Sequence, residues 1–322
     1  MSKFFNKKIV FPVIRSISTS IMPNTQAEWT RYIRFIGDDD KIYQGQPKII
    51  DNSGSWSNLT NVTKLEANLI IGDIFKENIK VTSDVIRVKK LLAPLDRSQV
   101  PIIRCIGLNY KEHAKETNQK IPPYPILFIK PNTSLQDPFE SIIVPDIATN
   151  NQVDYEAELA VIIKKECKNV TRDNSLDYVL GYTAANDVSA RKWQGKNLGS
   201  GQWCFSKGFD TFCPIGPTLV SPRIIKNPNS LGIRAIVNNK ILQNSNTQDM
   251  IFDVPELISF LSQGTTLLPG TIILTGTPPG VGFIRDPPIF LQDGDNVSIE
   301  IDEIGILTNP VKYEKSGRQI KL

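Results

Sequence analysis

Short apolar segments recur through the last two thirds of the chain, and each is bounded by glycine, proline or asparagine. They are rich in isoleucine and valine, which favour strands over helices. We expect strands at 101–108, 125–131, 141–145, 158–165, 179–189, 231–239, 271–278 and 296–307. This pattern predicts an α+β protein that is mostly β, with its strands in a closed or rolled sheet.

One segment, 253–264, has the apolar spacing of a helix. Asp253 is a residue type that caps helix N-termini, and Glu256 follows it three residues later, as in a capping box. Gly264 is suited to end the helix. We therefore predict a helix here, and it is the clearest helix signal in the chain.

The first hundred residues are organised differently from the rest. The segments that start at Arg31 and Lys41 have strand character, and a turn around 37–40 joins them into a predicted hairpin. A stretch containing two prolines then leads into the strand-rich part of the chain. We predict a small N-terminal α/β domain over 22–95 and a larger, mostly β domain over 96–322.

Residues 1–21 are basic, contain several serines and include no acidic residue. Their apolar core is short and contains a proline, so a secretory signal fits poorly. The composition is typical of a mitochondrial transit peptide, which predicts a location in the matrix. A start at Met22 would instead give a cytoplasmic form.

Overall composition excludes several classes of function. The net charge of +4 is small and dispersed, so nucleic acid is not an expected partner. No apolar stretch approaches the ~20 residues that span a bilayer, so no membrane partner is expected. The four cysteines lack CxxC spacing, and His113 is the single histidine of the chain. Metal sites built from thiolates or from several imidazoles are therefore excluded.

Two glutamates stand at the head of an apolar segment in VDYEAELAVII, which begins at Val153. Side chains two apart on a strand share a face, so Glu156 and Glu158 would lie side by side and repel each other. Taken alone, they also fit a solvated edge strand. Asp187 ends another predicted strand, and three carboxylates converging from two strands make an all-oxygen site for Mg²⁺, Mn²⁺ or Ca²⁺.

Six motifs, in order over about two hundred residues, resemble those of the fumarylacetoacetate hydrolase family. They are GLNYKEHAKE from Gly107, FIKPNTSL from Phe128, DYEAELAVII from Asp154, NDVSAR from Asn186, KGFDTFCPIGP from Lys207 and TGTPPGVG from Thr275. The resemblance covers about residues 100 to 312. It is strongest to the branch called domain-containing protein 2, which is similar to mitochondrial enzymes acting on oxaloacetate.

The resemblance implies a fold and a metal site. The fold is a mixed β-sandwich roll with the smaller N-terminal domain packed on it, and members usually form homodimers. Glu156, Glu158 and Asp187 would each give one oxygen to a single Mg²⁺ or Mn²⁺ ion. Lys207 would lie beside the metal, where an ammonium can hold a substrate carboxylate or a developing enolate.

The remaining motifs imply substrate contacts. Arg191 and Gln194 share a face if the segment is helical, and an arginine fork suits bidentate carboxylate recognition. The family usually has an acid after this arginine, where this chain has Lys192, so the charge near the site differs. The Gly276 and Thr277 backbone and the Thr277 hydroxyl are expected to grip an anion, although the motif also reads as a plain turn.

His113 and Glu116 are three apart on a predicted short helix. On the residues alone, a single histidine near an acid is more often a surface residue. In the family this pair activates water and its segment behaves as a lid, so the resemblance implies that Glu116 orients and polarises His113 for proton transfer.

Together these features predict an enzyme that interconverts enol and keto oxaloacetate, a small 2-oxo dicarboxylate, with a divalent metal. An acylpyruvate hydrolase or an oxaloacetate decarboxylase would use the same residues and is the alternative. A binding module that had lost its chemistry would show gaps in the ligand set or in the proton-transfer pair, and the sequence has none.

Overall fold

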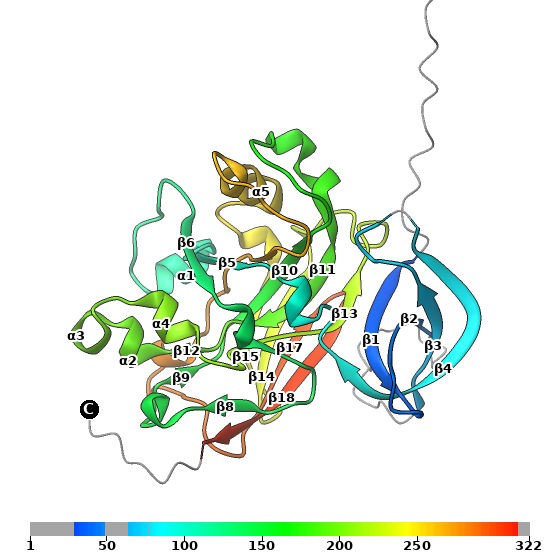
Figure 1. The fold of residues 1–322 in the computed structure, drawn as a ribbon. Coiled ribbons are helices and arrows are strands. Elements are labelled where there is room, and N and C mark those ends of the chain that lie inside the picture. The colour runs from blue at the N-terminus through cyan, green and yellow to red at the C-terminus, as the bar shows by residue number, and fades with distance from the viewer. Residues whose placement is uncertain (1–28, 49–63, 77, 315–322) are drawn as a thin grey trace, which may run out of the picture.

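The computed structural model describes residues 29–48, 64–76 and 78–314, and the predicted transit peptide lies outside these ranges. Strands dominate the described part of the chain, so the mostly β prediction is confirmed (Figure 1). Two large sheets and a small set of helices make up the architecture.

Four strands near the N-terminus form a small unit. They are β1 (Arg31–Gly37), β2 (Ile42–Pro47), β3 (Glu66–Ile71) and β4 (Lys80–Leu92). Each pairs antiparallel with the next, and β4 pairs back with β1, so the pairings close into a ring. The β1–β2 hairpin is the one predicted. Among the described residues before residue 96 no α-helix is present.

The first large sheet continues directly from this unit, because β1 also pairs antiparallel with β13. From there the order is β13, β11, β10, β16, β5 and β6, with β7 beside β13. The bounds are β5 (Ile103–Gly107), β6 (Ile126–Lys130), β7 (Leu135–Gln136), β10 (Ala157–Ile163), β11 (Val179–Asn186), β13 (Cys213–Val220) and β16 (Ile272–Leu274).

The second large sheet has the order β15, β14, β17, β18 and β8 and packs against β10, β11 and β13. The bounds are β8 (Ile142–Val144), β14 (Gly232–Val237), β15 (Lys240–Asn246), β17 (Asn296–Ile301) and β18 (Gly305–Tyr313). Two short strands, β9 (Val153–Asp154) and β12 (Ser189–Ala190), pair separately. The two packed sheets form the sandwich that the resemblance implies.

β10 lies at the centre of this sandwich, and all seven of its residues are buried. Leu159 and Val161 belong to the apolar core that the second sheet shares. Ala160 and Ile162 belong to a second core, on the other face, which includes Trp29 and residues of the N-terminal unit. A strand covered on both faces must be apolar throughout, so the charged residues at its start need special partners.

The described helices are short. They are α1 (Lys111–Glu116), α2 (Arg191–Gln194), α3 (Lys196–Gly199), α4 (Trp203–Lys207) and α5 (Val254–Ser262). The predicted helix is α5, and its N-cap Asp253 accepts the N–H of Glu256. The first four gather on the side of the molecule away from β1–β4 (Figure 1). No helix in the described ranges is long and apolar enough to cross a membrane.

Candidate metal and substrate site

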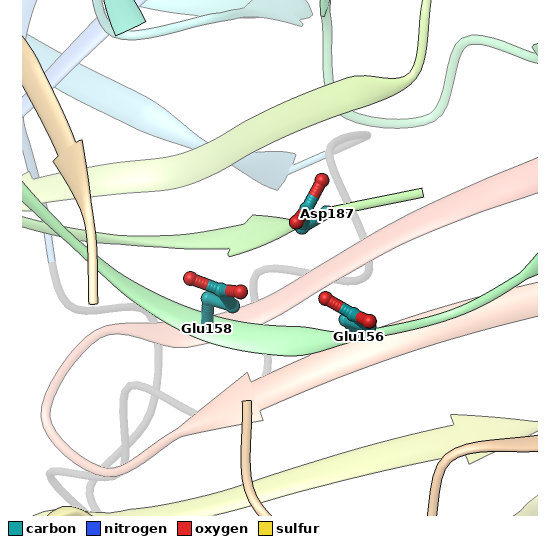
Figure 2. Close-up of side chains that lie close together, drawn as sticks. All are labelled: Glu156, Glu158 and Asp187. Atoms are coloured by element: carbon teal, nitrogen blue, oxygen red, sulfur yellow. The ribbon is translucent and has the colours of Figure 1, made fainter. Parts of the chain in front are cut away.

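Three buried carboxylates meet where β10 begins and β11 ends. Glu156 immediately precedes β10, Glu158 lies within it, and Asp187 immediately follows β11. The two strands are antiparallel neighbours, and the Asp187 N–H donates to the Glu156 carbonyl with an N···O distance of 3.0 Å. One oxygen of each carboxylate lies within 4.8 Å of the others (Figure 2). The strand pairing therefore brings together the three residues that the spacing singled out.

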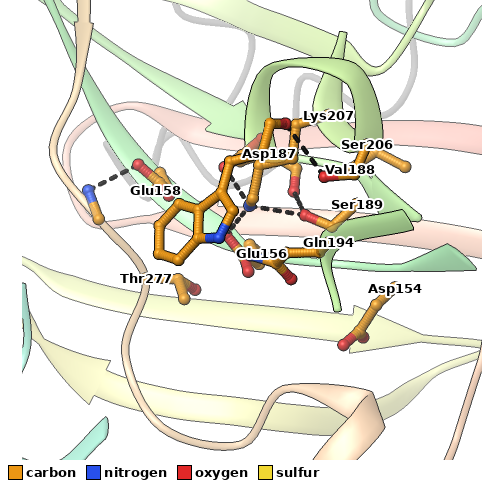
Figure 3. Close-up of polar contacts among 12 residues, drawn as sticks. Asp154, Glu156, Glu158, Asp187, Val188, Ser189, Gln194, Ser206, Lys207 and Thr277 are labelled. Atoms are coloured by element: carbon orange, nitrogen blue, oxygen red, sulfur yellow. Dashed lines mark hydrogen bonds and ion pairs between the residues drawn. The ribbon is translucent and has the colours of Figure 1, made fainter. Parts of the chain in front are cut away.

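Lys207, in α4, reaches into this cluster (Figure 3). Its Nζ donates to Glu156 Oε2 at 2.8 Å, to Asp187 Oδ2 at 2.6 Å and to Ser189 Oγ at 2.7 Å. Burial alone would raise the pKa of the Glu156 carboxyl, but Lys207 and Arg191 outweigh burial and lower that pKa to about 2. Glu156 is therefore a carboxylate at any physiological pH.

A second buried cation, Lys130, was not singled out from the sequence. It lies at the end of β6, and its Nζ is 2.7 Å from Asp187 Oδ1. The same ammonium donates to the carbonyls of Val188, Lys207 and Phe212. Lysine is almost never fully buried without partners, so a lysine in an apolar strand is the signal that would have found it.

Glu158 has no cationic partner among the described residues. Its Oε2 accepts the Gly276 N–H at 2.6 Å, and burial together with the nearby Asp187 and Glu156 holds its pKa well above the usual range. If all four carboxylates of the site are ionised, they exceed its three cations by one negative charge, which a bound cation would balance. These groups are Asp154, Glu156, Glu158 and Asp187 against Lys130, Arg191 and Lys207. An all-oxygen donor set with excess negative charge fits a divalent cation such as Mg²⁺ or Mn²⁺.

Arg191 begins α2 and connects the acidic cluster to Gln194. Its Nη1 lies 2.7 Å from Glu156 Oε1 and donates to Gln194 Oε1 at 2.9 Å, so the two residues share a face as predicted. Lys192 is exposed and donates to the Asn150 carbonyl at 2.7 Å. The charge that departs from the family pattern is therefore tied to a surface loop.

His113 and Glu116 face each other on α1. The His113 Nδ1 lies 2.6 Å from Glu116 Oε1, so Nδ1 carries the proton and Nε2 is left for a substrate. The Glu116 carboxylate also accepts the Gly280 N–H, at 3.0 and 2.9 Å from its two oxygens. His113 itself is 8% exposed, whereas Glu116 is exposed, so a carboxylate near the surface holds a buried imidazole.

The TGTPPGVG segment donates a hydrogen bond to a carboxylate of the site, whereas the sequence predicted contacts with a substrate anion. The Gly276 N–H is taken by Glu158, and Gly276 has a φ of +94°, where a side chain would meet Asn109. The Thr277 hydroxyl accepts Gln243 Nε2 at 2.9 Å, so its own proton remains to be donated. Of the two residues, only Thr277 reaches the cavity described next.

One cavity of about 240 Å³ joins these groups. Six predicted site residues line it: His113, Glu156, Arg191, Gln194, Lys207 and Thr277. Glu116, Glu158, Asp187 and Gly276 do not line the cavity themselves. The apolar part of the lining contains Ile106, Leu108, Phe128, Trp203 and Phe283. The volume lies below the ~300 Å³ at which pockets for drug-sized ligands begin, so a small metabolite is the ligand size that fits.

Buried titratable groups around one small cavity are typical of an enzyme rather than of a binding module. Residues 102–312 match the family described as fumarylacetoacetate (FAA) hydrolase C-terminal. The chain therefore belongs to the fumarylacetoacetate hydrolase family, as the motifs indicated.

Two relatives and one solved structure are similar to most of this chain. The chain is 49% identical over 221 residues to the mitochondrial oxaloacetate tautomerase fahd2 of Xenopus laevis, covering 69% of this chain and 68% of that one. It is 42% identical over 302 residues to the caffeoylpyruvate hydrolase of Neonothopanus nambi, covering 92% and 97%. Among solved structures, the 2-hydroxyhepta-2,4-diene-1,7-dioate isomerase of Mycobacterium marinum has a TM-score of 0.72 at 36% identity, covering 89% of this chain and all of that one.

Proposed function

We propose that this protein interconverts the enol and keto forms of oxaloacetate with the help of a divalent cation. The observation that carries the proposal is the shared cavity. Three side chains reach the cavity together: a histidine that a carboxylate holds, an arginine and a lysine. Beside them lie three carboxylates suited to a cation. Relatives named oxaloacetate tautomerases support the choice of substrate.

Glu156, Glu158 and Asp187 would hold Mg²⁺ or Mn²⁺ through one oxygen each. When bound, such an ion supplies Lewis-acid stabilisation of negative charge on a substrate oxygen. Lys207 Nζ, already within 2.8 Å of Glu156 Oε2, would add a fixed positive charge on the same side.

The other cavity residues would bind the substrate and move the proton. Arg191 and Gln194 would hold a carboxylate at one end, and the Thr277 hydroxyl would donate to it or to the second carboxylate. His113 Nε2 would take a proton from the enol hydroxyl or from C3 and return it to the other position. Glu116 stabilises the imidazolium that forms in between, because it lies 2.6 Å from Nδ1.

A second candidate is hydrolysis of acylpyruvates. The apolar wall of the cavity, with Phe128 and Trp203 in edge-to-face contact at a 5.6 Å centroid distance, offers a surface for an apolar acyl group. The relative named caffeoylpyruvate hydrolase covers nearly the whole chain. In this reaction His113 would activate water instead of shuttling a proton.

Localisation and assembly belong to the same proposal. We propose a mitochondrial matrix location, which relatives with mitochondrial names and the basic residues 1–21 support. We also propose a homodimer, on the strength of the family resemblance. Light scattering on the purified protein tests the assembly, because a monomer mass would contradict it.

The decisive experiment follows the absorbance of enol-oxaloacetate at neutral pH, with EDTA-treated protein and added Mg²⁺ or Mn²⁺. Pyruvate is measured in the same tube. We expect fast loss of enol without pyruvate, abolished in Glu158→Gln and His113→Ala. Glu166→Gln is the matched control, because Glu166 is an exposed glutamate outside the site. Direct Mn²⁺ binding by the same variants separates loss of cation from loss of chemistry.

The other possible outcomes would each indicate a different activity or contradict the role of the cation. Pyruvate formed in step with enol loss would replace the tautomerase with an oxaloacetate decarboxylase. Turnover of acylpyruvates alone would establish the hydrolase. Full activity after EDTA treatment and in Glu158→Gln would overturn the role of the cation.

A further inference from the structure

Asp154 is a buried carboxylate to which the proposed function assigns no role. It ends β9 and its side chain is 0% exposed. Three backbone N–H groups hold it: those of Tyr155 at 2.9 Å, Gly282 at 2.8 Å and Phe283 at 3.1 Å. A carboxylate with three backbone donors is fixed in position, because each hydrogen bond restricts where its oxygens can lie.

The fourth partner of Asp154 is Arg191, whose Nε donates to Asp154 Oδ2 at 2.8 Å. The Phe283 ring lies against the guanidinium, with 4.4 Å between the guanidinium carbon and the ring centroid. The same short segment therefore holds Asp154 through its backbone and Arg191 through its side chain. Glu156 and Gln194 take Nη1, as described above, so two of the three guanidinium nitrogens are engaged by the protein itself.

The third nitrogen, Nη2, is buried and has no hydrogen-bond partner among the described residues. Arg191 lines the cavity, and its side chain is 9% exposed. An unsatisfied buried donor is costly, and a charged one more so, which makes it a ready position for an anionic ligand. A bidentate fork through Nη2 would also need Nη1 or Nε, and the protein already engages both of these nitrogens. A carboxylate that reaches Nη2 would therefore meet a single free nitrogen of the guanidinium.

We propose that Asp154 is a positioning residue that holds Arg191 with Nη2 free, so that this one nitrogen binds one carboxylate of a dicarboxylate. The inference rests on the proposed function for the identity of the substrate. It adds a physical reason for the site to prefer a ligand with two carboxylates to a ligand with one. A ligand in which that carboxylate is masked loses the contact and leaves Nη2 unpaired.

The test measures binding without turnover. Dissociation constants for succinate and for monomethyl succinate are determined by calorimetry on the full protein with Mg²⁺ present. We expect the wild type to bind succinate about tenfold more tightly, the effect of one charge-assisted hydrogen bond. In Asp154→Asn the amide presents a donor toward Arg191 Nε or a backbone N–H, so Arg191 shifts and this preference falls to about one.

Two further variants show whether Asp154 acts through Arg191. Arg191→Met should lose the preference, and adding Asp154→Asn to it should change nothing more, because the partner is already gone. Asp302→Asn is the matched control: Asp302 also accepts a backbone N–H, from Gly232 at 2.8 Å, and pairs with an arginine, Arg234, outside the site. It should keep the full preference. If Asp154→Asn does not fold, Asp154→Glu, which keeps the charge but moves it, carries the same test.

An unchanged preference in Asp154→Asn overturns the proposal, and so do additive effects of the Asp154 and Arg191 substitutions. Equal binding of the two ligands by the wild type overturns it as well. None of these results depends on tautomerase activity. A protein that prefers succinate but leaves enol-oxaloacetate untouched would therefore retain this inference and lose the proposed function.

Discussion

Lysine–carboxylate pairs are exposed to solvent in the N-terminal unit and buried in the site. In the N-terminal unit the lysine–carboxylate pairs are solvated: Lys48 and Glu66 are 44% and 52% exposed, with 3.4 Å between Nζ and Oε2. In the site, Lys130 and Asp187 are both 0% exposed and lie 2.7 Å apart. Both contacts are lysine–carboxylate pairs, and the buried one is the shorter.

The surroundings decide what each pair contributes. Water screens an exposed pair and solvates either partner if the other is removed. A buried pair has surrendered that solvation, so each charge depends on the other and on the hydrogen bonds around it. A buried ion pair stabilises a fold no more than apolar residues of similar volume would in its place. Buried charges therefore indicate a role in chemistry rather than in folding.

The largest effect is expected when a buried cation is removed. Lys130→Met keeps the length of the side chain but leaves Asp187 Oδ1 and three carbonyls without their donor. The free energy of unfolding should fall by about 3–5 kcal/mol, the usual result of breaking one side of a buried pair. Denaturant unfolding measures it. A loss below ~1 kcal/mol would mean that water enters and replaces the ammonium, and the contrast between the two regions would then not hold.

A smaller effect is expected on catalysis when the orienting carboxylate is neutralised. In Glu116→Gln the amide still accepts from Nδ1 of His113 but no longer stabilises the imidazolium. We expect kcat on enol-oxaloacetate to fall about 100-fold, the lower end for general acid–base catalysis, with KM nearly unchanged.

Glu112→Gln is the control for this substitution, because it changes an exposed glutamate of the same helix that pairs with Lys115. Its kcat should remain at the wild-type value. Equal losses in both variants would assign the effect to the stability of α1. A rise in KM with unchanged kcat in Glu116→Gln would place Glu116 in substrate binding.

The fold was largely predictable because its strands are local signals. Segments of isoleucine and valine between glycine and proline contain β10, β11, β14 and β16. Several strands were not predicted, β13 and β15 among them. Prolines interrupt the first, Cys213–Val220, and polar residues fill the second, Lys240–Asn246. Both are strands because neighbours in the sheet satisfy their backbones, and a single sequence does not contain that information.

The site was predictable where its partners are close along the chain. Glu156 and Glu158 are two apart, and His113 and Glu116 are three apart, so local geometry places each pair. Lys130 and Asp154 were missed as site residues because their partners come from distant segments. A lysine or an aspartate in an apolar stretch signals a buried charge, yet which charge it meets depends on the packing of the sheets.

The smallest effect is expected for an exposed pair of the N-terminal unit. Lys48→Met is the same chemical change as the Lys130 substitution, made where Lys48 and Glu66 face solvent. The free energy of unfolding should change by less than ~1 kcal/mol, because water solvates the glutamate that is left behind. Added salt should shrink even this difference, since screening weakens exposed pairs and leaves buried ones nearly untouched. Denaturant unfolding of both methionine variants at low and high salt measures both effects. A loss at Lys48 as large as that at Lys130, and persisting in salt, would show that pairing and not burial sets the contribution to stability. The interpretation that the buried charges of the site serve chemistry would then lose its physical basis.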